Sequence, residues 1–336
     1  MSKDMDGVLL HSYDMSSVDH GVIVYESGFY NIVQVLFSQG ICRVAVPMFY
    51  FISGYLFYNE LKEWNWEVYG RKLKSRVSTI LIPYCIWNII GWFLLCLNHS
   101  FFKGDSSIWM SMTPWDILWS NDNGWPAVIP LWFIRDLIVV ILWAYLIYLF
   151  IKYLKTMGIL LLVLLYVSDS WISYPGFSPE STLFFALGCY MQITDKDPLK
   201  VSNFLGWISG IVFCIMLILR LITWNRCPID VSIQNILTIM GVILVLKLGS
   251  FIDTTKHRNI YDAFSKASFF VFATHLIYIL PAFRGIFNVL LPLDSQYMRV
   301  VGYFGCAVFT YFTCVIIYRL LYKLAPRLTS VLVGKR

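Results

Sequence analysis

The sequence predicts an all-α protein, a polytopic transmembrane helical bundle, and composition together with apolar segment length carries this prediction. Of its 336 residues, 58% are hydrophobic and 14% are charged, whereas a typical soluble domain has roughly 45–50% apolar and about 25% charged residues. Apolar runs of about 20 residues, which is the length needed to cross the hydrocarbon layer, recur along the chain. These features exclude a water-soluble enzyme, a disordered chain and a nucleic-acid partner, and they indicate a lipid bilayer as the surroundings.

Nine segments are apolar enough to be interpreted as full membrane spans. Two of them, 179–193 and 232–249, are short and would need neighbouring helices or a locally thinner bilayer. The predicted spans are 36–58, 77–98, 130–151, 156–173, 179–193, 204–224, 232–249, 266–284 and 300–318.

No internal repeat and no linker divides the chain, so we expect a single membrane domain over residues 1–336. Residues 1–27 are polar and contain neither a signal peptide nor a complete span. The run G-V-L-L-H-S-Y at 7–13 has the composition of the last turns of a helix. We therefore predict nine full spans plus an N-terminal stub of a tenth, with the bundle over 28–323 and a tail over 324–336.

The distribution of positive charge predicts the orientation. If the chain reaches the cytoplasm near Tyr58, then 18 of the 26 lysines and arginines fall in loops or ends on the cytoplasmic side. Cytoplasmic loops of membrane proteins carry such an excess. We expect the C-terminus to face the cytoplasm.

Charged residues inside predicted spans are candidate functional residues, because a charge within the bilayer costs several kcal/mol on insertion scales. Arg135 and Asp136 lie inside the span at 130–151. Adjacent helical positions point about 100° apart, so we expect each side chain to find a partner on another helix or in a wet cavity rather than to pair with its neighbour. A functional pocket and a structural ion pair between helices are the two alternatives.

Arg43 precedes V-A-V-P, in which Pro47 is expected to loosen the helix. Arg43 is either an interface anchor or a ligand for an anion in a pocket. Ser53 and Gly54 are small enough for close helix packing. Arg220 lies near the outer end of its span, so extension of its charged end to the membrane interface is favoured over a functional role.

Two histidines have apolar neighbours that make them candidates for chemistry. His11 ends the stub, where a neutral imidazole is a versatile base near neutral pH. His275 lies inside the span at 266–284, where one partner would satisfy it. The eight cysteines are scattered without a C-x-x-C pair, and no metal-binding motif occurs, so the sequence predicts no metal site.

Five segments, in this order, resemble signatures of the acyltransferase family 3 membrane proteins. They are R-V-A-V-P-M-F-Y-F-I-S-G-Y-L at 43–56, K-L-K-S-R-V-S-T-I-L-I-P-Y-C-I-W-N at 72–88, P-L-W-F-I-R-D-L at 130–137, L-F-F-A-L-G-C-Y at 183–190 and S-K-A-S-F-F-V-F-A-T-H at 265–275. The similarity is to bacterial O-acetyltransferases of surface polysaccharides.

The resemblance implies a core of ten transmembrane helices, of which this chain has most of the first one missing. V-L-L-H-S-Y matches the histidine end of the family's first helix, so His11 takes the catalytic role by resemblance. The arginine that the family carries upstream of this histidine falls before Met1. The family's pair of arginines in the inner loop has its nearest equivalent in Arg71 and Lys74, followed by Arg76.

The resemblance implies an O-acetyltransferase that moves an acetyl group from cytoplasmic acetyl-CoA to a hydroxyl of an exported glycan in the bacterial cytoplasmic membrane. His11 is expected to be the base, with Arg43 and Arg135 orienting the glycan or stabilising the oxyanion. Trp132, Asp136 and His275 are expected to bind substrate. The phosphates of acetyl-CoA are expected to be held by Arg71, Lys72, Lys74 and Arg76.

Two other functions are compatible with the same residues. Buried arginines in a bundle also suit a carrier that moves a glycan or lipid intermediate without chemistry. An inactive remnant of the family is the third hypothesis. The basic residues at 71–76 are also explained by the charge bias of cytoplasmic loops alone.

Overall fold

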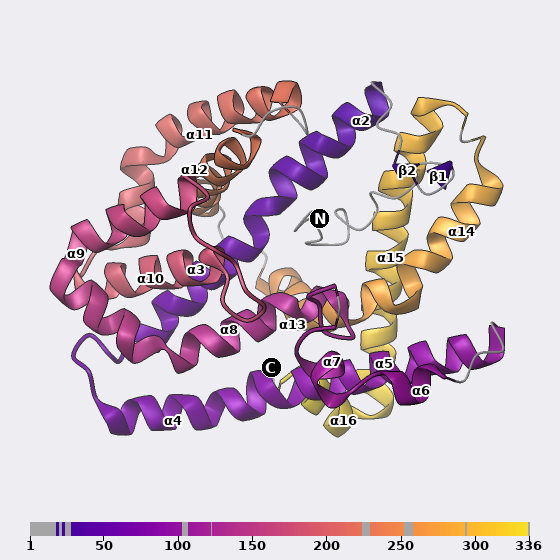
Figure 1. Ribbon diagram of the computed structural model, residues 1–336, viewed down its shortest axis with the longest axis horizontal. Helices are drawn as coiled ribbons and strands as arrows, with labels where there is room; N and C mark the ends of the chain where they lie inside the picture. Colours follow the sequence, from indigo (N-terminus) through magenta and orange to yellow (C-terminus); the bar gives the residue numbers. More distant parts are fainter. Residues whose placement is uncertain are drawn as a thin grey trace.

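The computed structural model describes residues 28–102, 107–121, 123–223, 229–251, 258–292 and 294–334, and the residue pairs 18–19 and 22–23. Within these residues the chain is almost entirely helical (Figure 1). The two-residue strands β1 (Val18–Asp19) and β2 (Val22–Ile23) pair antiparallel. The all-α prediction is confirmed.

The helices follow one another with short connections. The α-helices are α2 (Phe29–Gln34), α3 (Ala45–Tyr58), α4 (Trp66–Arg76), α5 (Ile82–Phe102), α6 (Ile108–Ser111), α7 (Pro114–Leu118), α8 (Trp132–Leu142), α9 (Ala144–Val167), α10 (Pro179–Ile193), α11 (Pro198–Thr223), α12 (Asp230–Gly249), α13 (Arg258–Thr274), α14 (Leu280–Leu290), α15 (Gln296–Leu324) and α16 (Pro326–Leu332). The π-helical segments are η1 (Val35–Ile41), η3 (Val77–Leu81) and η5 (His275–Ile279), and the 3-10 turns are η2 (Cys42–Val44) and η4 (Ile129–Leu131).

The predicted count of nine full spans is not confirmed. Among the described residues, seven continuous helices are long and apolar enough to cross a membrane. The span predicted at 130–151 is interrupted, because α8 ends at Leu142 after 11 residues. The next helix, α9, breaks at Lys155, whose backbone has φ 45° and ψ −123°. Helix α10 keeps the predicted bounds 179–193 but has only 15 residues. A straight span needs about 20 residues.

Each of the three π-helical segments lies just before a proline. Pro47 follows η1 and η2, Pro83 follows η3, and Pro281 follows η5, each within one to two turns. Proline has no N–H group and its ring clashes with the carbonyl four residues earlier, so the preceding turns lose their regular hydrogen bonds. The predicted loosening of the helix before Pro47 is thus observed, and it places Arg43 in an irregular turn.

Helices α3 and α10 pack closely through glycines. A Cβ atom at Gly54 would lie 2.9 Å from the Cα atom of Phe185, and one at Gly188 would lie 2.6 Å from the carbonyl oxygen of Phe51. Real Cβ atoms do not approach other atoms that closely, so only glycine allows this spacing. The expectation of close packing at Gly54 is confirmed.

Helix α3 is also tied to α8 and α9. The hydroxyl of Tyr50 donates to the carbonyl oxygen of Phe133 (3.0 Å), and that of Tyr58 donates to the carbonyl oxygen of Ala144 (2.7 Å). The first bond fixes the start of α8, which carries Arg135 and Asp136, against the helix that follows Arg43, and the second fixes the start of α9 against the same helix.

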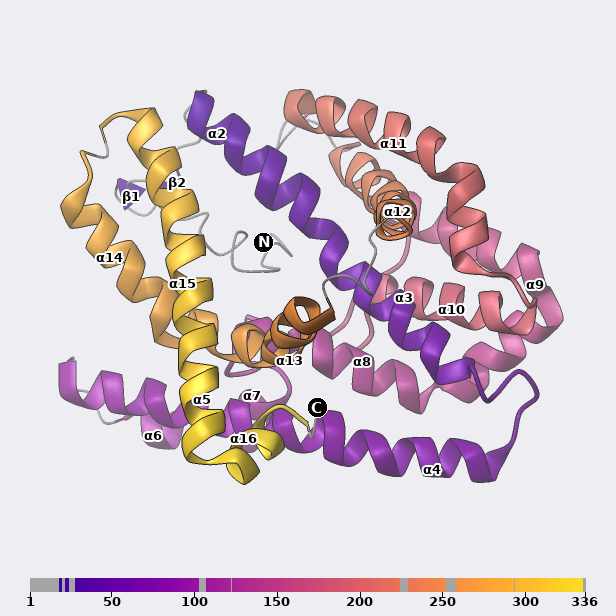
Figure 2. The same ribbon diagram turned by 180° about the vertical axis from the view of Figure 1, so that it is seen from behind.

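Helices α4 and α16 lie along one edge of the molecule, and the start of α2 and the turn from α14 to α15 lie at the opposite edge (Figures 1 and 2). The segment predicted as a tail contains α16, which packs on α5. The indole N–H of Trp87 donates to the carbonyl oxygen of Leu332 (3.0 Å). Residues 326–332 are therefore part of the folded body.

Candidate active site

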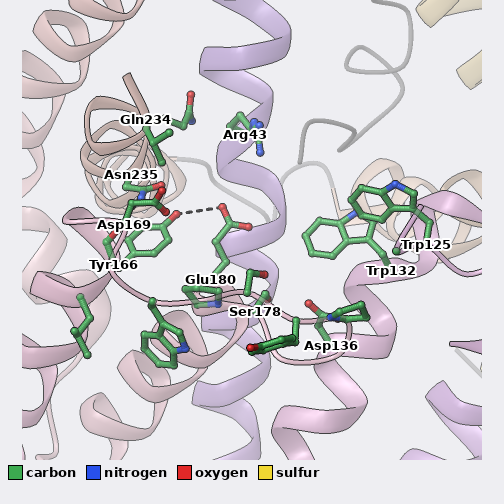
Figure 3. Close-up of a pocket in the computed structure, with 18 of the residues that line it drawn as sticks. Arg43, Trp125, Trp132, Asp136, Tyr166, Asp169, Ser178, Glu180, Gln234 and Asn235 are labelled. Atoms are coloured by element: carbon green, nitrogen blue, oxygen red, sulfur yellow. Dashed lines mark hydrogen bonds between the residues drawn. The ribbon is translucent and has the colours of Figure 1, made fainter. Parts of the chain in front are cut away.

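A cavity of about 660 Å³ lies where η2, α8, the end of α9, the start of α10 and the facing ends of α11 and α12 meet (Figure 3). Its size is within the range of small-molecule sites in proteins. It is lined by Arg43, Asn123, Gly124, Trp125, Trp132, Arg135, Asp136, Leu165, Tyr166, Asp169, Trp171, Ser173, Tyr174, Pro175, Ser178, Pro179, Glu180, Arg220, Asp230, Val231, Gln234 and Asn235.

Arg135 and Asp136 pair with each other, although they are adjacent in sequence. The Nε and Nη2 atoms of Arg135 both lie 3.1 Å from Oδ1 of Asp136, and both side chains are buried. The expectation that neighbours on a helix do not pair is wrong here. The arginine side chain is long enough to bend back over one residue, and burial makes an unpaired charge costly.

The same ion pair ties two loops together at the cavity. Nη1 of Arg135 donates to the carbonyl oxygens of Trp119 (2.6 Å) and Gly124 (3.1 Å). Oδ1 of Asp136 accepts from the backbone N–H of Gly176 (3.0 Å). Gly176 has φ 89°, in the left-handed region that favours glycine, and a Cβ atom there would meet the Trp119 ring. The loop before α8 and the loop before α10 are thus held to the same two side chains.

Arg43 and Glu180 lie close together in the cavity, with the Tyr166 hydroxyl beside them (Figure 3). Tyr166 donates to Oε1 of Glu180 at 3.1 Å. Glu180 stands in the first turn of α10, where the helix dipole favours a negative charge. Arg43 is 8% exposed, and the favourable interaction with Glu180 offsets part of the cost of burying its charge.

Arg220 and Asp230 join the facing ends of α11 and α12. Nη1 of Arg220 lies 2.6 Å from Oδ2 of Asp230 and donates to the backbone oxygen of the same residue at 2.8 Å. Arg220 is only 4% exposed. It was expected to extend to the membrane interface, and the structure instead places it in a buried ion pair that lines the cavity.

The cavity has an aromatic wall and a polar wall (Figure 3). Trp125 and Trp132 stand on one side with ring centroids 6.0 Å apart. Tyr166, Gln234 and Asn235 stand on the other side. Such a mixture of apolar surface and a few converging polar groups is typical of ligand sites.

The structure brings four of the predicted site residues together, since Arg43, Trp132, Arg135 and Asp136 all line this cavity. His275 does not line it. That ring is fully buried in η5, and its Nδ1 donates to the carbonyl oxygens of Val271 and Phe272, each at 3.0 Å. His11 lies outside the described residues.

The basic cluster of Arg71, Lys72, Lys74 and Arg76 is on α4 and does not line the cavity. Glu60 bridges two of its members, at 2.6 Å from Arg71 and 3.3 Å from Lys72. Lys72, and then Arg71, lower the pKa of Glu60 by stabilising its charged form. An anionic ligand at this cluster would compete with Glu60.

Apart from Asp136, sequence reasoning missed the carboxylates and amides of the cavity. Asp230 and Gln234 recur at a spacing of four on α12, and Glu180 opens α10. These were polar groups inside predicted spans or at their ends, so the rule that selected Arg135 would have found them. Asp169 is also a charged residue inside a predicted span, at 156–173, whereas Trp171 carried no such signal; the structure places both in the loop after α9. Within the described part of the chain, no three His, Cys, Asp or Glu side chains gather to hold a metal ion.

Comparison with known proteins identifies the family. A family model described as an acyltransferase domain, that of acyltransferase family 3, matches residues 7–319. The chain belongs to acyltransferase family 3. The match includes all five segments that resemble the family, and His11 as well. With the long apolar helices, family membership makes this chain a multi-pass membrane protein of an acyltransferase family.

A curated relative supports the assignment to acyltransferase family 3. The chain is 23% identical over 320 residues to the succinoglycan biosynthesis protein ExoH of Rhizobium meliloti (strain 1021), an alignment that covers 92% of this chain and 84% of the relative. No solved structure gives a significant match.

Proposed function

We propose that this protein is a membrane O-acyltransferase that transfers an acetyl group from acetyl-CoA to a hydroxyl of an exported or surface glycan. Membership in acyltransferase family 3 supports the transfer reaction. The relative named for succinoglycan biosynthesis supports a polysaccharide as the acceptor. We place the protein in the bacterial cytoplasmic membrane with its C-terminus in the cytoplasm.

The single observation that carries the proposal is the cavity that joins Arg43, from one resembling segment, to Trp132, Arg135 and Asp136, from another. These two segments are about 90 residues apart in the chain, yet their charged groups meet at one hollow in an otherwise apolar bundle. A protein bears the cost of burying so many charges where they serve a ligand or a reaction.

In the proposed reaction, the oxygen of a sugar hydroxyl attacks the thioester carbonyl carbon, and the C–S bond breaks. His11 accepts the hydroxyl proton as general base, and the imidazolium then returns this proton to the CoA thiolate that leaves. Arg43 is proposed to stabilise the negative charge that develops on the carbonyl oxygen. Arg135 and Asp136 hold the loops that surround the acceptor.

The donor is proposed to approach from the side of α4. Three phosphate groups make CoA strongly anionic, and Arg71, Lys72, Lys74 and Arg76 supply cations on one short helix. Figure 1 shows α4 at one edge of the molecule. A cytoplasmic donor and an exported acceptor would then meet inside the bundle, which accounts for an acyltransferase built from membrane helices.

A carrier without chemistry is the rival function, because buried ion pairs also suit a transport path. The two functions differ in whether acetyl-CoA is consumed. A remnant that binds glycan without transfer is the third alternative, and the same assay separates it.

The test is acetyl transfer by the full chain in membrane vesicles. Vesicles with and without the protein receive acetyl-CoA labelled in the acetyl group, and alkali-labile label is counted in the extracted polysaccharide and glycolipid fractions. We expect transfer by the wild-type chain and loss of at least about a hundredfold in His11→Ala and Arg43→Gln, since each removes a group that acts in the transition state.

Arg319→Gln is the matched control, because Arg319 is exposed near the end of α15 and does not line the cavity. It should keep the wild-type rate. Labelled polysaccharide formed equally by wild type and His11→Ala would contradict the proposed base. Glycan moved across the vesicle membrane with no label in it would favour the carrier.

A further inference from the structure

We infer that the cavity holds a neutral sugar ring, with one indole of the T-shaped Trp125–Trp132 pair against its apolar face and the side-chain amides of Gln234 and Asn235 bonded to its hydroxyls. This inference rests on the proposed function, and it names the class of acceptor and the residues that select it. Three observations carry it, namely the two unlike walls, two amide oxygens without donors, and the charge of the lining.

The two walls match the two kinds of surface on a pyranose ring. A pyranose has an apolar face made of C–H groups and a rim of hydroxyl groups. Figure 3 shows Trp125 and Trp132 across the cavity from Gln234 and Asn235. A planar indole supplies a large apolar surface at low entropic cost. A ring that lies against the tryptophans would direct hydroxyls toward the amides.

Asn235 has its amide fixed in one orientation. Its Nδ2 donates to the backbone oxygen of Tyr166 at 2.7 Å, so the oxygen Oδ1 is left as an acceptor. Among the described residues no donor meets this oxygen, and Asn235 lines the cavity. A hydroxyl group of a ligand would supply the missing donor.

The side-chain oxygen of Gln234, one residue earlier, also lacks a hydrogen-bond donor. Its Nε2 donates to Oγ1 of Thr238 at 3.2 Å, and its buried Oε1 has no partner among the described residues. Gln234 is 7% exposed and lines the cavity. An unsatisfied buried acceptor destabilises a protein. Gln234 keeps one such acceptor at the cavity, and the neighbouring Asn235 adds a second side-chain oxygen that no donor meets among the described residues, so this wall can receive hydroxyl donors from a ligand.

The charges of the lining favour a neutral ring over an acidic one. Arg43, Arg135 and Arg220 face the carboxylates of Asp136, Asp169, Glu180 and Asp230. Two of these arginines are already in ion pairs, with Asp136 and Asp230. A uronate would bring another negative charge to a lining in which the described carboxylates outnumber the guanidinium groups.

The test is ligand binding by saturation-transfer NMR, with the full chain in lipid nanodiscs. The probes are the methyl pyranosides of glucose, galactose and mannose, and the uronates of glucose and galactose. We expect saturable binding of at least one neutral glycoside, with the strongest saturation on the protons of one ring face. The matching uronate should bind at least about tenfold more weakly.

Two variants test the amides separately. Gln234→Leu and Asn235→Leu should each weaken binding of the neutral glycoside by about tenfold, the effect of losing one well-placed buried hydrogen bond. Gln234→Leu should also keep or raise the unfolding temperature, because leucine removes an unsatisfied buried acceptor. Gln192→Leu is the matched control, since Gln192 is buried, bonds to the carbonyl oxygen of Tyr55 and does not line the cavity.

The inference is overturned if no neutral glycoside binds, if the uronates bind equally well, or if both cavity variants keep the wild-type affinity. These outcomes are distinct from failure of the proposed function. Amide-dependent glycoside binding without acetyl transfer would keep the inference and reject the enzyme. Acetyl transfer to glycan by a protein that prefers uronates would keep the enzyme and reject the inference.

Discussion

Arg135 uses its hydrogen-bond donors on the protein itself. Nη1 holds two carbonyl oxygens of the loop before α8, and Nε and Nη2 hold Asp136, which in turn holds the N–H group of Gly176. A planar guanidinium can bond to several acceptors at once in fixed directions, whereas a lysine ammonium is a point charge on a flexible stem. At the residue scale, Arg135 therefore positions the cavity loops.

Arg135→Lys should loosen both loops while keeping the charge. We expect the KM for the glycan acceptor to rise by at least about tenfold, the effect of losing charged hydrogen bonds to the loops, with little change in the KM for acetyl-CoA. Steady-state transfer assays with each substrate varied in turn measure this. If both KM values stay at wild-type values and only kcat falls, Arg135 acts on the reacting atoms instead.

Sequence reasoning identified Arg135 from the cost of burying a charge, and it failed on the partner. The rule about neighbouring helical positions concerns the directions of Cα–Cβ bonds. It does not describe a side chain as long as arginine in a site where two loops supply further acceptors. The partners Trp119, Gly124 and Gly176 lie on loops whose positions depend on contacts far along the chain, and no local pattern predicts those.

At the scale of single elements, glycines set the distance between α3 and α10. The carbonyl oxygen of Phe51 occupies the place where a side chain at Gly188 would begin. Gly188→Leu should separate the helices and destabilise the protein by about 1–3 kcal/mol, as overpacking does. Thermal unfolding of the purified protein, followed by circular dichroism, measures the effect.

Gly285→Ala is the control for this prediction, because nothing lies within 4 Å of a Cβ atom at that position on α14. It should leave the unfolding temperature unchanged or raise it slightly, since alanine favours helix over glycine. An unfolding temperature unchanged by Gly188→Leu would show that the two helices are not in close contact.

Charge reversals on helix α4 test whether its basic residues bind acetyl-CoA or only orient the chain in the membrane. Lys74→Glu and Arg76→Glu should raise the KM for acetyl-CoA by at least about tenfold through lost charged contacts to phosphate, and added salt should raise the wild-type KM. Initial rates at varied acetyl-CoA concentration test this. The control is Lys200→Glu, an exposed lysine near the start of α11.

If the charges on α4 served only to orient the chain in the membrane, both reversals would lower the amount of inserted protein and leave the KM unchanged. Quantifying the protein in each vesicle preparation separates the two results. Pro47 is a second element-scale feature that the sequence predicted correctly, because the missing N–H group acts locally and disturbs the turns that carry Arg43.

For the whole molecule, composition and segment length predicted the all-α class, because lipid restricts a spanning chain to few structures. The number of spans was not predictable in the same way. Trp143 and Lys155 interrupt apolar segments without a proline or a glycine at either position. The sequence predicted only part of the cavity lining. The predicted residues reach the cavity from α8 and η2. Gln234, Asn235 and Glu180 join them only through the packing of α9, α10 and α12.

The most direct measurement of the central claim, that the glycan acceptor occupies this cavity, is acetyl transfer after chemical blocking of the cavity. Val231 lines the cavity and Val245 does not, although both are on α12 and each is 42% exposed. Val231→Cys and Val245→Cys, in detergent, are treated with N-ethylmaleimide beside the wild-type protein with its own cysteines.

We predict that the transfer rate of the blocked Val231→Cys protein is at least about tenfold lower than before modification, because the adduct displaces the acceptor. Glycan added before the reagent should protect it, and the Val245→Cys and wild-type proteins should keep their rates. Full-rate transfer after complete modification of the thiol introduced at position 231 would contradict the placement of the acceptor in this cavity.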